Sequence, residues 1–199
     1  MDESYLVEAA QKGDLEAFNR LVLHYQDMAY NLAYRMVSDG DVAADVTQKA
    51  FLSAYRSLSS FRGGSFKAWV LRMVTNASYD ELRHRKRHPS VPLKPVDEYD
   101  EEIESPEWLK DGDPSPEQMV ERAELDRAIQ QCLEGLPPEF RVVALMVDIE
   151  GLDYQQVANV IEKPLGTIKS RLARARLRLR ECLSHYLELL PAEMRLDGR

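Results

Sequence analysis

A run of basic residues in the C-terminal half offers the clearest chemistry in the chain. Seven Lys or Arg and no acidic residue lie between Lys163 and Arg180. An ordinary exposed helix mixes in acidic side chains one turn away, and a bare row of cations repels itself unless a polyanion neutralises it. A solvated basic face is the simpler alternative, but the pattern favours contact with a nucleic acid.

The residues around this run have the layout of a helix-turn-helix. Asp153 can cap a short helix, and Pro164 and Gly166 predict the turn that follows it. The expected buried side of the first helix is Val157, Ala158 and Ile161, and that of the second is Ile168, Leu172, Ala175 and Leu179. In such a motif, the first residues of the second helix meet base edges in the major groove and later ones hold phosphates.

A second basic run closes a helical segment in the N-terminal half, where Arg83 to Arg87 contains four Lys or Arg. The loop before this segment carries Gly63 and Gly64 and is rich in aromatic residues. Aromatic side chains beside a basic helix suit single-stranded nucleic acid, because unstacked bases lodge against apolar faces while cations follow the backbone. The alternative is that these aromatic residues, Phe61, Phe66 and Trp69, are ordinary core residues.

The remaining reactive side chains predict no metal site and no cofactor. Cys132 and Cys182 lie fifty positions apart with no neighbouring Cys or His, so they are interpreted as reduced structural thiols and not as a redox pair. His84 and His88 could share a helix face, but the three basic residues between them would repel a metal cation.

Helical spacing of apolar residues runs through most of the chain, and no alternating strand pattern occurs. It predicts three helices between Ser4 and about Leu58, a loop over Ser59 to Ser65, and a fourth helix over Phe66 to Arg87. Another helix is expected from Glu117 to the break at Gly135. Two more precede the turn at Lys163 to Gly166, and a final helix extends to about Leu190.

The charge distribution separates two helical halves. The net charge is −8, but twelve acidic and three basic residues between Pro89 and Glu124 give −9, so the rest of the chain carries +1. Six prolines interrupt the same stretch, which forbids long helices there. We therefore expect an all-α chain of two small domains, 1–88 and 116–190, joined by a flexible acidic linker over 89–115 and followed by a tail over 191–199.

Taken together, these segments resemble the extracytoplasmic-function (ECF) group of the sigma-70 family of bacterial sigma factors. The string Asp45-Val-Thr-Gln-Lys-Ala-Phe51 is similar to the family's segment that docks on the clamp helices of RNA polymerase. By this resemblance, Phe51 packs inside. The resemblance assigns polymerase contacts to Asp45, Gln48, Lys49 and Ala50.

Two further strings extend the resemblance to promoter DNA. The segment from Phe61 to Trp69 is similar to the loop that captures a flipped base of the −10 element, and Pro164 to Arg171 is similar to the −35 recognition helix. The resemblance implies −10 contacts by Phe61, Arg62, Ser65, Phe66, Trp69, Arg72, Asn76, Arg83 and Arg87. It implies −35 contacts by Thr167, Lys169, Ser170, Arg171, Arg174, Arg176 and Arg178.

The function implied is that of an alternative sigma factor with a four-helix promoter-melting domain and a helix-turn-helix domain. Its expected partners are the clamp helices and flap of core RNA polymerase, promoter DNA that is duplex at −35 and single-stranded at −10, and an anti-sigma factor released by a stress signal. The resemblance implies no enzymatic activity, because polymerase supplies the catalytic site. The longest apolar stretches fall far short of the roughly 20 residues of a membrane span, so a cytoplasmic protein without membrane insertion is expected.

Two other function classes compete with this one. A free-standing helix-turn-helix regulator would bind duplex DNA without polymerase, usually as a dimer on a palindrome, but leaves Asp45 to Phe51 unexplained. A helical enzyme would need a nucleophile, phosphate loop or metal cluster that the sequence does not show. The acidic linker is either a plain solvated spacer, the simpler interpretation, or an autoinhibitory segment that covers the basic faces until polymerase separates the domains.

Overall fold

The computed structural model describes residues 2–88, 116–186 and 188, and within these ranges the chain is helical without a β-strand. This agrees with the predicted all-α class. The expected acidic linker over 89–115 and the tail over 191–199 lie outside the described residues.

Four helices form the N-terminal domain, at the positions that the apolar spacing predicted. Each begins at a residue whose side-chain oxygen accepts a backbone N–H three residues ahead, namely Asp2, Asp14, Asp39 and Ser65. Such caps satisfy amide groups that a helix cannot satisfy itself. The helices are α1 (Glu3–Gln11), α2 (Leu15–Val37), α3 (Gly40–Ser57) and α4 (Phe66–Arg87), with a short 3-10 turn η1 (Leu58–Ser60) after α3.

The C-terminal domain begins with α5 (Pro116–Glu134) and α6 (Pro138–Ala144), which continues as a π-helical turn η2 (Leu145–Ile149). The helix-turn-helix is α7 (Tyr154–Ile161) and α8 (Leu165–Leu183), and a 3-10 turn η3 (Ser184–Tyr186) follows.

Two details of the helix-turn-helix differ from the predicted boundaries. The sharp change of direction comes at Glu162, which has a left-handed backbone with φ of 52°, while Gly166 already lies in the first turn of α8. The regular α-helix ends at Leu183 and therefore falls short of the predicted Leu190. Asp153 does cap α7 as predicted, in a reciprocal capping box with Gln156.

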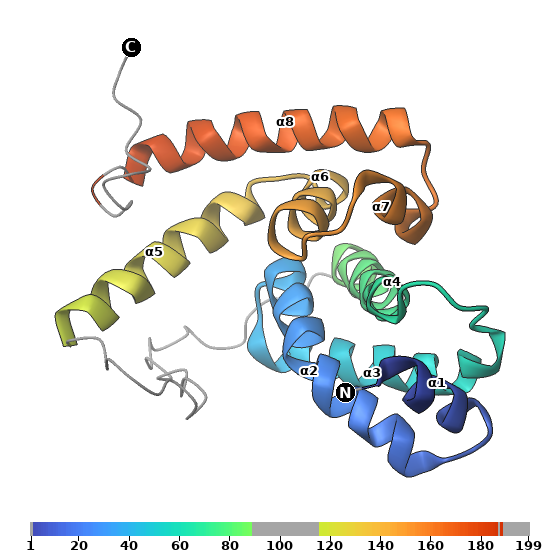
Figure 1. The fold of residues 1–199 in the computed structure, drawn as a ribbon. Helices are drawn as coiled ribbons and strands as arrows, with labels where there is room; N and C mark the ends of the chain where they lie inside the picture. The colour runs from blue at the N-terminus through green and yellow to red at the C-terminus, as the bar shows by residue number, and fades with distance from the viewer. Residues whose placement is uncertain (1, 89–115, 187, 189–199) are drawn as a thin grey trace.

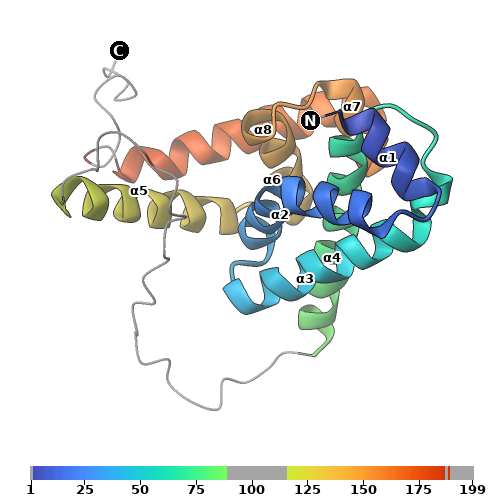
Figure 2. The same cartoon turned by 60° about the horizontal axis from the view of Figure 1, so that its bottom comes forward.

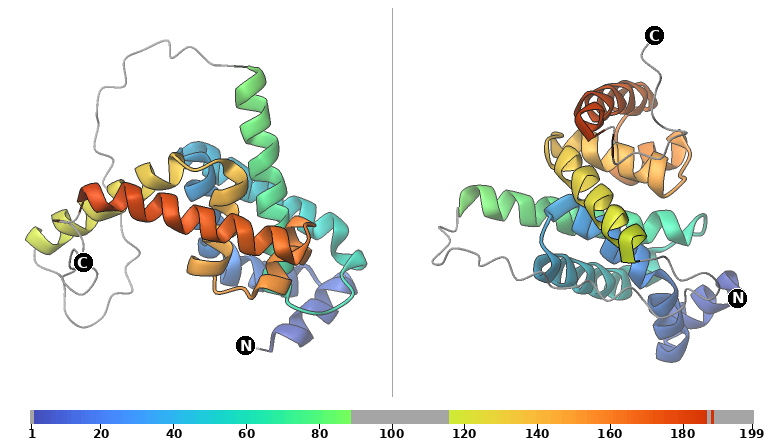
Figure 3. Two further views of the ribbon diagram at one scale, coloured as in Figure 1. Left: turned by 90° about the horizontal axis from the view of Figure 1, so that it is seen from above. Right: turned by 90° about the vertical axis from the view of Figure 1, so that its left-hand side faces the viewer.

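Both domains use the predicted apolar faces for their cores. In the N-terminal domain α2, α3 and α4 pack on one another around Leu21, Leu32 and Val70, and Figure 2 shows them crossing. In the C-terminal domain α8 lies along the outer side, with α6 and α7 between it and α4 (Figures 1 and 3). The buried apolar residues form a continuous cluster through both domains, so the domains pack directly against each other.

Arg141 is a buried polar link across this domain boundary. Arg141 is 6% exposed, and its guanidinium donates hydrogen bonds to the backbone oxygens of Met36 at 2.6 Å and Glu134 at 2.8 Å. A further hydrogen bond, to the Leu136 oxygen, measures 3.3 Å. Burial lowers the pKa of Arg141. The side chain thus connects the end of α2 to the turn between α5 and α6.

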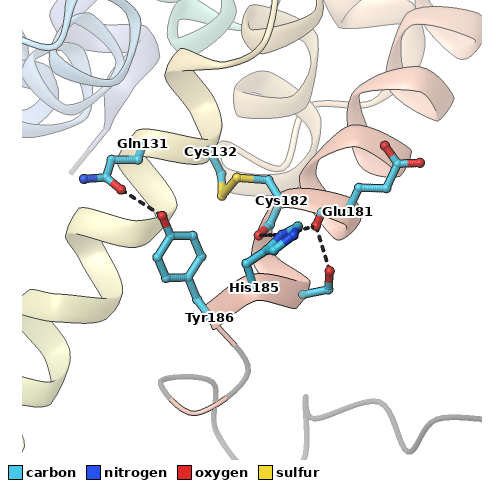
Figure 4. The surroundings of a disulfide bond; sticks show 7 residues. Gln131, Cys132, Glu181, Cys182, His185 and Tyr186 are labelled. Atoms are coloured by element: carbon cyan, nitrogen blue, oxygen red, sulfur yellow. Dashed lines mark hydrogen bonds between the residues drawn. A yellow bond between two sulfur atoms is a disulfide. The ribbon is translucent and has the colours of Figure 1, made fainter.

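Cys132 and Cys182 are joined by a disulfide, so the prediction of reduced thiols is wrong. Fifty residues separate the two cysteines in sequence, but their Cα atoms lie 5.7 Å apart. The fold brings the last turn of α5 against the last turn of α8, as Figure 4 shows. Sequence spacing could not reveal this approach, because it depends on how three intervening helices pack.

Candidate nucleic-acid and partner interfaces

The predicted polymerase-binding residues form an exposed ridge on α3, with one exception. Asp45, Gln48 and Lys49 are exposed, and Leu52 continues the ridge one turn further at 47% exposure. Ala50 is only 1% exposed and packs in the core. Because its position on the helix faces inward, Ala50 offers no exposed surface in this arrangement, and its polymerase contact stays a prediction.

A groove of about 550 Å³ lies beside this ridge, between α2 and α3. Gln48 and Phe51 line it together with two apolar side chains that sequence reasoning missed, Leu52 and Tyr55. Tyr55 is 43% exposed. Their residue types suggest a core, and only the fold shows that they face solvent beside the polar ridge.

A second groove, of about 500 Å³, separates α3 from α4. Lys49 of the predicted polymerase set lines it with Asn76 and Arg87 of the predicted −10 set. Asp80 also lines it and is paired with Arg83. The structure therefore brings the two predicted sets together on adjoining faces of the N-terminal domain.

Arg85, in the second basic run, is held by the protein itself. Its guanidinium donates to the Val37 backbone oxygen at 3.2 Å, to Asp39 at 3.1 Å and to Glu81 at 3.2 Å. These contacts fasten the end of α4 to the α2–α3 connection. Arg85 is therefore less available to a phosphate backbone than its neighbours in the basic run. Arg83 and Arg87 are exposed.

The aromatic loop divides into one core residue and two partly exposed ones. Phe66 is 2% exposed and lies in the core, so its direct contact with DNA stays a prediction that this arrangement does not favour. Phe61 and Trp69 are half-buried, and their ring centroids lie 5.6 Å and 5.4 Å from that of Phe66. Phe66 is therefore the anchor on which the other two rings rest.

The chain around this aromatic cluster is fixed from α1. The Gln11 amide donates to the backbone oxygens of Leu58 at 3.0 Å and Phe61 at 2.9 Å, a role that the sequence did not indicate. Arg62 and Ser65 are exposed, but the Ser65 hydroxyl oxygen accepts the Ala68 N–H as the cap of α4. Its hydroxyl proton remains able to donate to a base or phosphate.

On α8 the predicted apolar stripe and basic faces are observed. Ile168, Leu172 and Ala175 are buried, and Leu179 is half-buried. Of the predicted −35 residues, Thr167 and Arg171 are half-buried. The exposed members are Lys169, Ser170, Arg174, Arg176 and Arg178.

Two of the exposed arginines are already engaged within the domain. Arg176 donates to Asp148, with an Nε–Oδ2 distance of 3.2 Å, and this hydrogen bond raises the pKa of Arg176. Arg178 lies over the Phe140 ring, 5.4 Å from its centroid. Both contacts hold the guanidinium groups in place on the surface of α8, which suits phosphate contacts better than base reading.

Residues of both predicted DNA-binding sets meet at the boundary between the domains. Arg72 on α4 pairs with Glu162 of the helix-turn-helix, and neighbouring Lys67 pairs with Glu150 at 3.1 Å. Burial raises the pKa of Tyr79 on α4 to about 12, and the nearby Arg171 cation partly opposes this shift. In this arrangement Arg72 is ion-paired across the domain boundary, and Arg171 lies near Tyr79 of the N-terminal domain.

Within the described parts of the chain, no group of three or more His, Cys, Asp and Glu side chains could hold a metal ion. The rings of His84 and His88 have centroids 5.0 Å apart at the end of α4. In the same residue ranges, no helix has the length and apolar character that crossing a membrane requires.

The fold and its surfaces define a two-domain helical DNA-binding protein whose second domain carries a helix-turn-helix. Two family profiles match it: sigma-70 region 2 over residues 21–88 and sigma-70 region 4 over residues 126–179. The RNA polymerase sigma-H factor of Pseudomonas aeruginosa is 38% identical over 187 residues, which cover 93% of this chain and 95% of that protein. The ECF RNA polymerase sigma-E factor of Escherichia coli K12 is 39% identical over 178 residues, which cover 88% and 91%.

Solved structures give the same picture of the fold. CnrH, in complex with the cytosolic domain of CnrY, aligns with a TM-score of 0.66 at 22% identity over 91% of this chain and 96% of that one. The sigma factor RpoE of Bartonella quintana, in complex with the anti-sigma factor NepR, aligns with a TM-score of 0.63 at 25% identity over 85% and 98%. The chain belongs to the ECF group of the sigma-70 family and is an alternative sigma factor. A free-standing helix-turn-helix regulator is not favoured.

Proposed function

We propose that separate surfaces of this chain carry out the separate steps of promoter recognition. The proposal rests on where the three predicted residue sets lie. The polymerase set is on α3, the −10 set is on the aromatic loop and α4, and the −35 set is on α8. We assign polymerase and −10 binding to residues 1–88 and −35 binding to 116–190. The segment 89–115 then connects the two domains.

The α3 ridge is the proposed docking face for the clamp helices of core RNA polymerase. Asp45 and Gln48 offer exposed polar groups on successive turns, while Leu52 and Tyr55 add exposed apolar surface beside them. Exposed polar groups beside exposed apolar side chains are typical of protein–protein interfaces, in which the apolar centre is desolvated on binding. We place the contact of the C-terminal domain at the polymerase flap.

Co-elution with core polymerase on a sizing column tests this assignment. The double variant Asp45→Ala, Gln48→Ala is expected to lower the affinity about tenfold or more, because both polar contacts lie at the proposed interface. A matched control is Glu8→Ala with Gln155→Ala, which removes an exposed acid and an exposed amide elsewhere. Equal affinity of the two double variants for polymerase would contradict the assignment of the α3 ridge.

For promoter melting we propose that Phe61, Trp69 and Asn76 receive an unstacked base of the −10 element, while Arg62, Arg83 and Arg87 follow the backbone. Exposing a base costs a few kcal/mol, which pocket and stacking contacts recover. Because one chain binds both the −10 and the −35 element, the second contact is effectively intramolecular. Two weak binding sites therefore give a high overall affinity for the promoter.

On α8 we expect Arg171 to read a base edge. Arg171→Ala should cost about 1–3 kcal/mol at one base position of the −35 element in the holoenzyme. Arg176→Ala is the comparison, because Arg176 is paired with Asp148 and should give a smaller loss that is the same for every sequence. Binding to a set of −35 duplexes with single base changes measures both, and a uniform loss for Arg171→Ala would make it a phosphate contact.

The domain contacts add a conformational step to this scheme. Arg72 is paired with Glu162 across the domain boundary, and Arg171 lies near Tyr79 of the N-terminal domain, so we propose that core polymerase separates the domains on binding and makes both side chains available to promoter DNA. The linker hypothesis from the sequence concerns residues outside the described ranges. Independently of the linker, the direct contacts between α4 and α7 lead us to expect that the free chain binds DNA more weakly than the holoenzyme does.

We further propose that the chain works in the cytoplasm, where bacterial polymerase and DNA are located, and that it has no catalytic activity of its own. An anti-sigma factor is a proposed partner. The support is RpoE of Bartonella quintana, which is similar to this chain and is bound to the anti-sigma factor NepR.

A further inference from the structure

The disulfide between Cys132 and Cys182 joins the last turn of α5 to the last turn of α8, one turn after Arg178 of the predicted −35 set. Cys132 is 2% exposed in the last turn of α5, whereas Cys182, in the last turn of α8, is half-buried. Beside the bond, the Tyr186 hydroxyl donates to the Gln131 amide oxygen at 2.9 Å (Figure 4). The bond and this hydrogen bond together fasten α5 to the end of α8.

The bond encloses the whole helix-turn-helix. All of α6 and α7 and the DNA-reading part of α8 lie within the fifty-residue separation of the two cysteines. Ala128 and Cys132 are buried beside the bond but are not part of the continuous apolar core, to which the neighbouring Leu133 belongs. The covalent link therefore adds an attachment of α5 to α8 outside that core.

A disulfide at this place is unusual for a protein that acts beside RNA polymerase. In the cytoplasm thiols are kept reduced, and the disulfides found there are usually redox-sensing or catalytic. In the described residues, these cysteines belong to no group of three or more His, Cys, Asp and Glu side chains that could hold a metal ion. We propose that Cys132 and Cys182 form a reversible redox site that controls how firmly α5 holds the helix-turn-helix. This inference rests on the proposed function for the compartment in which the chain works.

The chemistry needs an oxidant such as a peroxide and a dithiol reductant. Cys182 is the more accessible thiol, so its thiolate attacks the peroxide first: an S–O bond forms, the O–O bond breaks, and water leaves. Cys132 then attacks the Cys182 sulfur, the S–S bond forms and a second water leaves. Two thiols are oxidised and one hydrogen peroxide is reduced to two waters.

Reduction reverses this sequence by thiol exchange. One thiolate of the dithiol attacks the accessible Cys182 sulfur, and the Cys132 sulfur leaves and takes up a proton. The second thiol of the reductant then displaces the Cys182 thiol and closes its own disulfide. Both cysteines are then free thiols, and the dithiol reductant has been oxidised by two electrons.

The consequence is a difference in stability that is confined to the C-terminal domain. Cross-linking across fifty residues restricts the unfolded chain and, on the loop-entropy estimate, shifts the unfolding equilibrium of the enclosed domain by about a thousandfold. Reduction should release α5 from α8 and leave α1 to α4 unchanged. A loosened α5 would weaken the frame that positions α8 for −35 binding.

Hydrogen exchange and thermal unfolding of the full chain without polymerase test the structural part. On reduction we expect the amides of α5 to exchange at least tenfold faster and the midpoint of the C-terminal thermal transition to fall by roughly 20 °C, with the N-terminal domain unchanged. Cys132→Ser with Cys182→Ser should resemble the reduced chain under all conditions. Because Cys132 is buried, its replacement could prevent folding. In that case Cys182→Ser alone, which also removes the disulfide, replaces the double variant in the test.

Equilibration with glutathione buffers, followed by alkylation and mass spectrometry, tests reversibility. Interconversion of the pair at the glutathione ratios of a reducing cytoplasm supports the redox site. A pair that stays in one state across those ratios, or α5 exchange that is equal in both states, would overturn it. Neither measurement involves polymerase. Failure of the redox proposal can therefore be told apart from failure of the proposed function, which the co-elution experiment tests.

Discussion

Phe66→Ala is expected to destabilise the N-terminal domain by about 3–5 kcal/mol, the usual cost of removing a buried aromatic side chain. Phe66 is 2% exposed and contacts the rings of Tyr25, Phe61 and Trp69. Its removal leaves a cavity under the aromatic loop, and the neighbouring rings lose the surface on which they rest. Urea unfolding followed by circular dichroism measures the loss.

Trp69→Ala provides the comparison within the same cluster. Trp69 is half-buried, so its removal should cost less stability and should instead weaken holoenzyme binding to a single-stranded −10 oligonucleotide by about 1–3 kcal/mol, the usual contribution of a stacked base. If Phe66→Ala kept full stability and lost only −10 binding, Phe66 would be a DNA contact after all, and its assignment to the core would be wrong.

The helices of both domains could be predicted because local signals determine them. Asp14, Asp39 and Ser65 cap helices at the places where the apolar spacing begins, and the stripe through Ile168 and Leu172 gave the buried face of α8. These signals depend on neighbouring residues alone. The sequence therefore located the elements that carry the proposed interfaces.

Two predicted site residues, Ala50 and Phe66, are buried because the family motif is a continuous string, whereas a helix turns every few residues toward the core. Ala43, Val46, Ala50 and Ala54 recur at helical spacing and are all buried. Had this periodicity been applied to the docking segment, Ala50 would have been placed in the core. Phe66 likewise follows directly on the cap Ser65, at the start of a helix whose apolar face points inward.

Other features depend on long-range packing and leave no local signal. The disulfide needs the last turns of α5 and α8 to meet, and the exposure of Leu52 and Tyr55 needs the α2–α3 groove. Arg141 is the clearest case. An arginine near a helix start is normally solvated, and only the packing of two domains explains why this one is 6% exposed.

Arg141→Met is expected to cost about 2–4 kcal/mol and to open the domain boundary. Methionine has a similar shape but no donors, so the backbone oxygens of Met36, Glu134 and Leu136 lose the hydrogen bonds that offset their burial. If the closed arrangement restrains the free chain, the variant should show a larger radius of gyration by small-angle X-ray scattering. It should also bind −35 duplex DNA more tightly than the unmodified chain when polymerase is absent.

Two further variants distinguish domain opening from unfolding. Arg127→Met removes an exposed arginine of α5 and should change neither size nor affinity. Glu150→Gln keeps the shape of a side chain that is 10% exposed but weakens its ion pair with Lys67 across the boundary, so it should raise DNA affinity in the same direction by a smaller factor. A folded Arg141→Met or Glu150→Gln chain that binds −35 DNA no better than the unmodified chain would show that contact between the domains does not limit DNA binding by the free chain.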